Sequence, residues 1–153
     1  MLGFGRALGL VAAVLVGAIA GLPGQGADAG GMIAVKLGLG DLKKTDRAQL
    51  WKRVDEYAIV EGLHEFCGKK LNIERRAWKA VGACIDASSL RRVAGVFRSK
   101  KATYVKAWEA ANGDAEKKTA LCDQWRKQLG EYAGIISRQI AEAASLCRAC
   151  LFC

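Results

Sequence analysis

Apolar residues recur every three to four positions along most of this chain, and no proline interrupts the pattern. The only proline, Pro23, precedes all of the periodic segments. A spacing of three to four places apolar side chains on one face of an α-helix, whereas a half-buried strand requires strict alternation. The spacing therefore predicts an all-α chain, which we expect to form a four-helix up-and-down bundle.

Turn and capping residues divide the periodic region into four helices. The first is expected to begin near Asp41 and to end at Cys67, where Gly68 can adopt the left-handed conformation that commonly follows a helix. Asn72 is expected to cap a shorter second helix, which continues to Ile85. The two boundaries leave a short connection between these helices.

The third helix is expected to begin at a cap formed by Ser88 or Ser89. The segment Asn112-Gly113-Asp114 then predicts a stop followed by a new N-cap. The fourth and longest helix extends from there to Cys147.

Four tryptophans fall one per predicted helix, each on the apolar face. Large aromatic side chains at such positions typically anchor a core, and this is the role that we expect. Stacking on a sugar or a nucleobase is the alternative role. The four residues are Trp51, Trp78, Trp108 and Trp125.

The first 29 residues are typical of a secretory signal peptide. Arg6 precedes an apolar run from Leu8 to Leu22, and Ala27 and Ala29 provide small residues before a cleavage site. The run is shorter than the roughly 20 residues that span a bilayer, which favours cleavage. The alternative is that the segment is retained as an N-terminal anchor. We expect cleavage after Ala29 and export to the periplasm or beyond the cell. A flexible glycine-rich lead-in (residues 30–40) and a helical domain (residues 41–153) would follow.

An even number of cysteines in an exported chain is typical of a disulfide framework. With a rise of about 1.5 Å per residue, the helix lengths bring Cys67 level with Cys122, so we expect these two to be bonded. A straight fourth helix would carry its last cysteines about 20 Å past Cys84. We therefore expect a bend near Gly130 or Gly134 that returns one of them to Cys84. The six cysteines are Cys67, Cys84, Cys122, Cys147, Cys150 and Cys153.

The last three cysteines form a Cys-x-x-Cys-x-x-Cys sequence, Cys147, Cys150 and Cys153, which has two other interpretations. Three thiolates on neighbouring helical turns suit a soft ion such as Cu(I) or Zn²⁺. A Cys-x-x-Cys pair is also used in thiol–disulfide exchange. An oxidising compartment favours disulfides over both, so metal binding or thiol-redox chemistry is the alternative hypothesis, and the main hypothesis needs no cofactor.

The chain is basic, with 24 lysine and arginine residues against 15 aspartate and glutamate residues and a formal charge of +9. The densest basic stretch lies between residues 91 and 101 and contains no acidic residue. We expect it to attract an anionic protein, a glycan or a membrane surface. Nucleic acid is not expected, because the chain is exported and lacks a recognition motif. The predicted basic patch comprises Arg91, Arg92, Arg98, Lys100 and Lys101.

The sequence contains no recognisable catalytic motif. His64 is the only histidine, and Glu61 and Glu65 lie beside it at helical spacing. An exposed histidine near a helix end is usually passive, so we expect no acid–base chemistry from this group. The main hypothesis is a small, exported, non-catalytic binding protein of the cell envelope or periplasm, stabilised by disulfides and presenting a basic surface.

Overall fold

The computed structural model describes residues 36–150. They form four helices: α2 spans Lys44–Phe66, α3 spans Ile73–Val81, α4 spans Ala87–Asn112 and α5 spans Ala115–Cys150. Within this range the only extended pairing is one isolated bridge, so the all-α prediction is confirmed there. The expected signal peptide and its cleavage site, like Cys153, lie outside the described residues.

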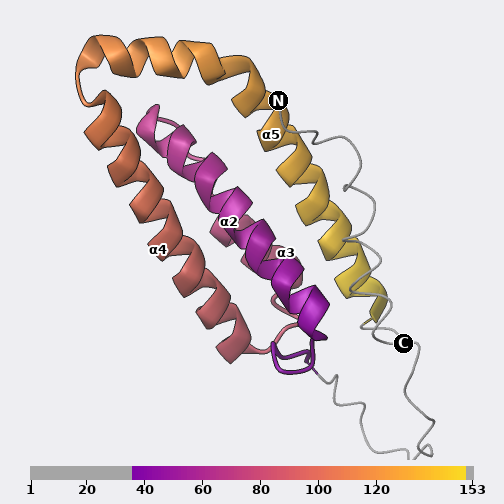
Figure 1. Ribbon diagram of the computed structural model, residues 1–153. Helices are drawn as coiled ribbons and strands as arrows, with labels where there is room; N and C mark the ends of the chain where they lie inside the picture. Colours follow the sequence, from indigo (N-terminus) through magenta and orange to yellow (C-terminus); the bar gives the residue numbers. More distant parts are fainter. Residues whose placement is uncertain (1–35, 151–153) are drawn as a thin grey trace, which may run out of the picture.

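The chain runs along α2, returns along α3, runs along α4 and returns along the second part of α5 (Figure 1). α2 and α4 lie side by side and form the most extensive helix–helix contact, whereas α3 packs mainly on α5. α3 has only nine residues, and α5 changes direction part-way along its length (Figure 1). The four helices therefore differ in length, and the short α3 follows α2 and precedes α4 along the chain.

The ends of α2 and α3 are fixed by two left-handed residues and one carboxylate. Gly68 follows α2 with a φ of 75°, as predicted. Asn72 precedes α3 with a φ of 54°, but its side chain makes no capping hydrogen bond. The N–H of Ile73 instead donates to the carboxylate of Glu61 at 2.9 Å, so a residue of α2 caps α3.

α3 is shorter than predicted: it ends at Val81, and Ile85, expected in its last turn, pairs with the lead-in instead. Ile85 pairs with Leu37 in an isolated parallel bridge. The N–H of Leu37 donates to the carbonyl of Cys84 at 2.9 Å, and the N–H of Asp86 donates to the carbonyl of Leu37 at 3.0 Å. These bonds hold the end of the lead-in against the α3–α4 turn.

α4 is capped by Asp86, and not by a serine as the sequence predicts. The Asp86 carboxylate accepts hydrogen bonds from the N–H groups of Ser88 and Ser89, both at 2.9 Å. The hydroxyl of Ser89 accepts from the N–H of Leu39 at 2.8 Å. The last residues of the expected flexible lead-in are thus tied to the start of α4. At the start of α5, Asp114 is the cap, as predicted.

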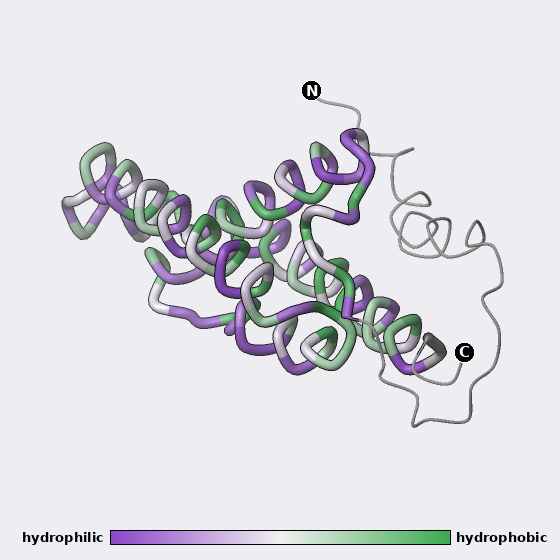
Figure 2. The backbone as a smooth tube through the Cα atoms, turned by 90° about the horizontal axis from the view of Figure 1, so that it is seen from below, coloured by the Kyte–Doolittle hydropathy of each residue, from purple (hydrophilic) through white to green (hydrophobic). Residues whose placement is uncertain are grey.

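Two clusters of buried apolar side chains hold the helices together, and Figure 2 shows hydrophobic and hydrophilic residues alternating along every helix. This two-faced pattern is what packing on one side requires. One cluster joins all four helices, and the other lies where the end of α2 meets α5. Their members are Val54, Ala58, Ile73, Phe97 and Ile136 in the first, and Leu63, Phe66 and Leu129 in the second.

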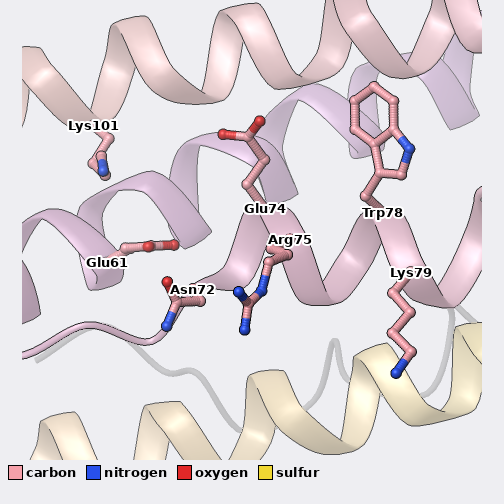
Figure 3. Close-up of a pocket in the computed structure, with 7 residues that line it drawn as sticks. All are labelled: Glu61, Asn72, Glu74, Arg75, Trp78, Lys79 and Lys101. Carbon is pink, nitrogen blue, oxygen red and sulfur yellow. The ribbon is translucent and has the colours of Figure 1, made fainter.

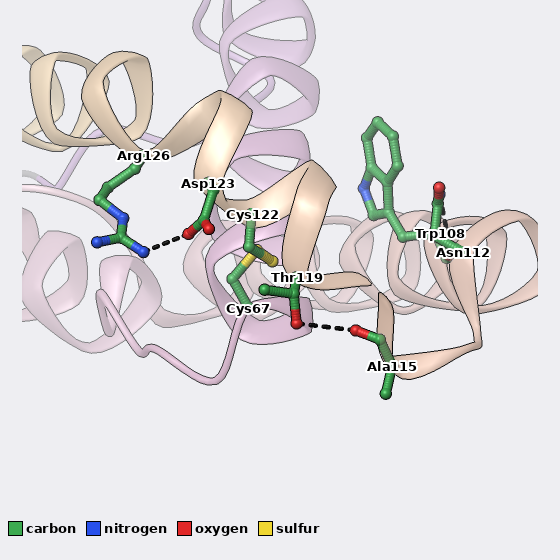
Figure 4. The surroundings of a disulfide bond; sticks show 8 residues. All are labelled: Cys67, Trp108, Asn112, Ala115, Thr119, Cys122, Asp123 and Arg126. Atoms are coloured by element: carbon green, nitrogen blue, oxygen red, sulfur yellow. Dashed lines mark hydrogen bonds and ion pairs between the residues drawn. A yellow bond between two sulfur atoms is a disulfide. The ribbon is translucent and has the colours of Figure 1, made fainter. Parts of the chain in front are cut away.

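Two disulfides join segments that are far apart in the sequence. Cys67 at the end of α2 is bonded to Cys122 of α5, the pair that the helix lengths predict (Figure 4). Cys84 in the α3–α4 turn is bonded to Cys147, because the change of direction in α5 returns its last turns to this end of the molecule. The Cα–Cα distance is 5.7 Å in each pair, which is ordinary for a disulfide.

Among residues 36–150, no helix combines the length with the apolar character that crossing a bilayer requires.

Candidate binding surface

Two lysines of the predicted basic patch, which lies on α4, form ion pairs with α2. The Nζ of Lys100 lies 2.7 Å from Oδ1 of Asp55, and the Nζ of Lys101 lies 2.6 Å from Oε2 of Glu65. Tyr104 donates a second hydrogen bond to Asp55, at 2.8 Å. Hydrogen bonding from Lys100 holds the pKa of Asp55 below its usual range, so this carboxylate is ionised at neutral pH.

The α2·α4 contact that carries these pairs is close because of Gly62. A Cβ atom placed on Gly62 would lie 3.3 Å from Cβ of Tyr104 and 3.4 Å from the carbonyl oxygen of Lys101. Ala58, which has no exposed surface, lies one turn before Gly62. Small side chains on α2 therefore allow the charged groups of the two helices to meet.

The three arginines of the predicted patch divide into one paired and two unpaired residues. Arg98 lies 3.8 Å from Glu74 of α3. Arg91 and Arg92 are exposed at the start of α4, and no carboxylate of the described residues pairs with them. Three of the five predicted cations therefore serve as contacts between helices, and the densest basic stretch of the sequence is not the most available one.

A second group of cations lies on the α2–α3 connection and on α3. All four are exposed, and within residues 36–150 none forms an ion pair with a carboxylate. Arg76 of the same helix does not belong to this group, because it is half-buried and donates to Ser137 at 2.8 Å. We refer to the four as the α3 basic surface: Lys69, Lys70, Arg75 and Lys79.

A hollow of about 520 Å³ lies over α3 (Figure 3). Glu74 and Trp78 extend from α3 towards α4, whereas Arg75 and Lys79 extend towards α5. Cations, carboxylates, an amide and one indole thus surround a single depression. Its lining residues are Glu61, Asn72, Glu74, Arg75, Trp78, Lys79 and Lys101.

Trp78 departs from the prediction that all four tryptophans are core residues. Trp51, Trp108 and Trp125 are half-buried and pack on the two clusters, but Trp78 is 37% exposed. Its indole lies beside Gly82, where a Cβ atom would come within 3.4 Å of the ring.

Glu61 is buried in the wall of the hollow, with 7% of its surface exposed. Burial raises the pKa of Glu61, and the hydrogen bond from the N–H of Ile73 acts in the opposite direction by favouring the charged form. Because the carboxylate is engaged at the N-terminus of α3, its first role is to position this helix and the surface that it carries.

His64 is buried, contrary to the expectation of an exposed residue, with 5% of its surface exposed. Its Nε2 lies 3.2 Å from the carbonyl of Leu129, and its Nδ1 has no partner. Burial lowers the pKa of His64, which makes the neutral ring the stable form at pH 7. Glu65 pairs with Lys101 and Glu61 faces α3, so the three residues do not form an acid–base cluster.

The Cys84–Cys147 bond removes Cys147 from the three-thiolate set considered for a metal or for redox chemistry. In the part of the chain that the structure describes, no three His, Cys, Asp or Glu side chains are grouped to hold a metal ion. The side chain of Cys150 and the whole of Cys153 lie outside that part. A three-thiolate site that includes Cys147 would therefore require the Cys84–Cys147 bond to be reduced.

No protein-family model matches the chain, and neither a curated protein nor a solved structure is significantly similar to it.

The sequence does contain a signal for the α3 basic surface, but the density of cations along the chain does not reveal it. Residues 69–79 contain five cations and one acid, Glu74, and that acid is paired with Arg98 of α4. The stretch from 91 to 101 contains no acid of its own, yet acids of α2 and α3 neutralise most of its cations. The number of cations in a segment therefore indicates an available basic surface less well than the carboxylates on the helices packed against it.

Proposed function

We propose that this chain is an exported, non-catalytic binding protein, an up-and-down helical bundle that holds an anionic partner on the α3 basic surface. The observation that carries the proposal is that Lys69, Lys70, Arg75 and Lys79 are exposed and form no ion pair with the described carboxylates. Unpaired cations gathered in one region produce a positive potential that attracts and orients anions.

The two disulfides support the exported location, because such bonds form and persist in oxidising compartments such as the periplasm and the extracellular space. The predicted signal peptide is in keeping with this location. The bonds also fix the fold around the surface: one holds the end of α2 and the other holds the turn that follows α3.

A binding role also agrees with how the potentially reactive groups are used. Glu61 caps α3, and His64 donates to a backbone carbonyl inside the fold. The groups that face solvent on the α3 basic surface are ammonium and guanidinium groups, which suit recognition of carboxylate, phosphate or sulfate.

The test compares two matched double variants in the full exported chain. Arg75→Gln/Lys79→Gln removes two charges from the α3 basic surface, and Arg91→Gln/Arg92→Gln removes two exposed charges from α4. Binding is measured at low and at physiological salt to three probes: polygalacturonate, polyglutamate and vesicles containing anionic phospholipid. We expect at least one probe to bind, with affinity falling as salt rises.

For that probe, the α3 variant should weaken binding at least tenfold, and the α4 variant less than twofold. Equal losses in the two variants would show that net charge alone drives binding and would overturn the assignment to α3. Failure of all three probes to bind at low salt would overturn the proposal itself.

A further inference from the structure

Trp78 is an apolar ring in polar surroundings. The six other residues that line the hollow over α3 are all charged or polar, and the indole is 37% exposed among them. Exposed indole surface leaves the favourable burial of a large aromatic group unused. One isolated ring does not make a pocket for an apolar ligand, but it offers a flat face to a ligand that is itself flat, small and only partly polar.

The other groups that line the hollow both donate and accept hydrogen bonds, those of Glu74 on the α4 side of α3 with Trp78 and those of Arg75 and Lys79 on the α5 side. Arg75 and Lys79 only donate, the Glu74 carboxylate only accepts, and the amide of Asn72 does both. Glu74 lies 3.8 Å from Arg98, which is too long for a hydrogen bond and leaves its oxygens available. Glu74 repels the carboxylates of any polyanion, but it can accept hydrogen bonds from a ligand that also carries hydroxyl groups.

The size of the depression agrees with a ligand of a few rings at most. Its volume of about 520 Å³ falls within the range of small-molecule sites. Arg75 and Lys79 are four residues apart and therefore separated by about 6 Å along the helix axis. This spacing lets each contact a different acidic group of one extended ligand.

We infer that the anionic partner is an acidic saccharide, a sugar chain that bears carboxylates of the uronic-acid type. The C–H face of one sugar ring covers the indole of Trp78, and its hydroxyls bond to Glu74 and Asn72. A carboxylate forms a bidentate pair with the guanidinium of Arg75, and the next acidic unit reaches Lys79. The inference rests on the proposed function, and it names the class of ligand for the same surface.

Two other anionic partners fit these observations less well. A lipid surface is flat, so it would bring Glu74 against anionic head groups and leave the hollow empty. An acidic peptide provides carboxylates, but it has no ring of C–H groups for Trp78 and few hydroxyls for Glu74 and Asn72. Both are separate outcomes of the test.

The test uses the full chain with both disulfides intact and compares an oligogalacturonate with a polyglutamate peptide of the same number of carboxylates. Affinities are measured by calorimetry, and the indole is followed by tryptophan fluorescence. We expect the oligogalacturonate to bind at least tenfold more tightly. Trp78→Leu, which keeps apolar contact with Gly82 but removes the flat ring, should weaken oligogalacturonate binding about tenfold and leave peptide binding unchanged.

Glu74→Ala separates the two kinds of recognition by the sign of its effect. If Glu74 accepts hydrogen bonds from hydroxyl groups, the variant binds oligogalacturonate more weakly, although the loss of a carboxylate makes its net charge more positive by one. If the surface recognises charge alone, the same variant binds both probes more tightly. Circular dichroism of each variant checks that the helices are intact.

Equal affinity for the two probes, with no effect of Trp78→Leu, would overturn the saccharide inference and leave the α3 basic surface in place. Binding to anionic vesicles but not to the oligogalacturonate would overturn it in favour of a lipid partner. The absence of binding to every probe would remove the proposed function as well.

Discussion

Residues 91–101 of α4 and the segment from Lys69 to Lys79 each carry five cations close together, but the two groups are used in different ways. On α4, Lys100, Lys101 and Arg98 contact carboxylates of neighbouring helices. On α3 and the connection before it, four of the five project from the fold with no such contact. The comparison teaches that a basic segment is a binding surface only to the extent that its own fold does not neutralise it.

The largest expected effect comes from forcing α2 and α4 apart, since their close contact is what allows the α4 cations to be paired. Gly62→Leu would place its Cβ 3.3 Å from Cβ of Tyr104 and 3.4 Å from the carbonyl oxygen of Lys101, and the rest of the leucine side chain would have no room. We expect the free energy of unfolding to fall by about 3 kcal/mol, measured by urea denaturation with the disulfides intact.

The matched control for this variant is Gly95→Leu in α4, where a Cβ atom would meet nothing within 4 Å. Leucine is a better helix former than glycine, so a gain of about 0.5 kcal/mol is expected there. Similar losses in both variants would contradict the close approach at Gly62.

A smaller effect should follow the removal of one acceptor between α2 and α4. Asp55→Ala leaves Lys100 and the hydroxyl of Tyr104 without their shared partner. Because the group is partly solvated, we expect a loss of about 1 kcal/mol in thermal or urea denaturation. Asp123→Ala is the control, since Asp123 is exposed and pairs with Arg126 of its own helix (Figure 4). This variant should change stability by less than about 0.5 kcal/mol. A loss as large in the control would show that Asp55 has no special role.

Acidification should separate stability from anion binding. The pKa of His64 is lower in the folded protein than its ordinary value of 6.5, because the ring is buried. Below pH 6.5 the unfolded chain takes up a proton that the folded protein resists, so stability declines as the pH falls from 6.5 towards the folded pKa. The α3 basic surface contains no histidine, so we expect anion binding to be retained over the same range of pH.

Urea denaturation between pH 7.5 and 5 measures this decline, and His64→Gln is the variant that should reduce it. The carboxyl of Glu61 has a raised pKa, so its own contribution has the opposite sign: acidification through that pKa favours the folded protein. A profile that His64→Gln leaves unchanged would exclude His64 as the origin of the decline.

The smallest effect is expected at Arg98, whose distance of 3.8 Å from Glu74 and largely exposed side chain indicate a weak ion pair. Arg98→Gln should lower the free energy of unfolding by about 0.3 kcal/mol, within the range of surface pairs. Anion binding on α3 should weaken less than twofold. A fall in the free energy of unfolding above about 1 kcal/mol would contradict a weak pair and show that Arg98 stabilises the helix packing as strongly as Lys100 and Lys101.

Features that depend on local pattern were predictable from the sequence. The helical segments follow from the spacing of apolar residues, and Gly68 and Asp114 stand at the predicted helix boundaries. The Cys67–Cys122 bond follows from the rise per residue together with the up-and-down order of the helices, which brings the end of the first helix level with the first turns of the fourth.

Features that depend on the register between helices were not predictable. Lys100 meets Asp55 across 45 residues of sequence and Lys101 meets Glu65 across 36, and no local pattern indicates these partners. The exposure of Trp78 likewise depends on how α3 packs against the neighbouring helices, and no local pattern indicates that packing. The availability of the cations on the proposed binding surface therefore depends on contacts between helices that no local pattern indicates.

The two disulfides overlap along the chain: Cys84 lies inside the loop closed by Cys67–Cys122, and Cys122 lies inside the loop closed by Cys84–Cys147. Any single cut of the backbone between residues 67 and 147 therefore leaves the two pieces joined by at least one covalent bond. Between residues 84 and 122 both bonds join them. A protease that clips this molecule once in its bonded region creates a new pair of chain ends and releases no fragment.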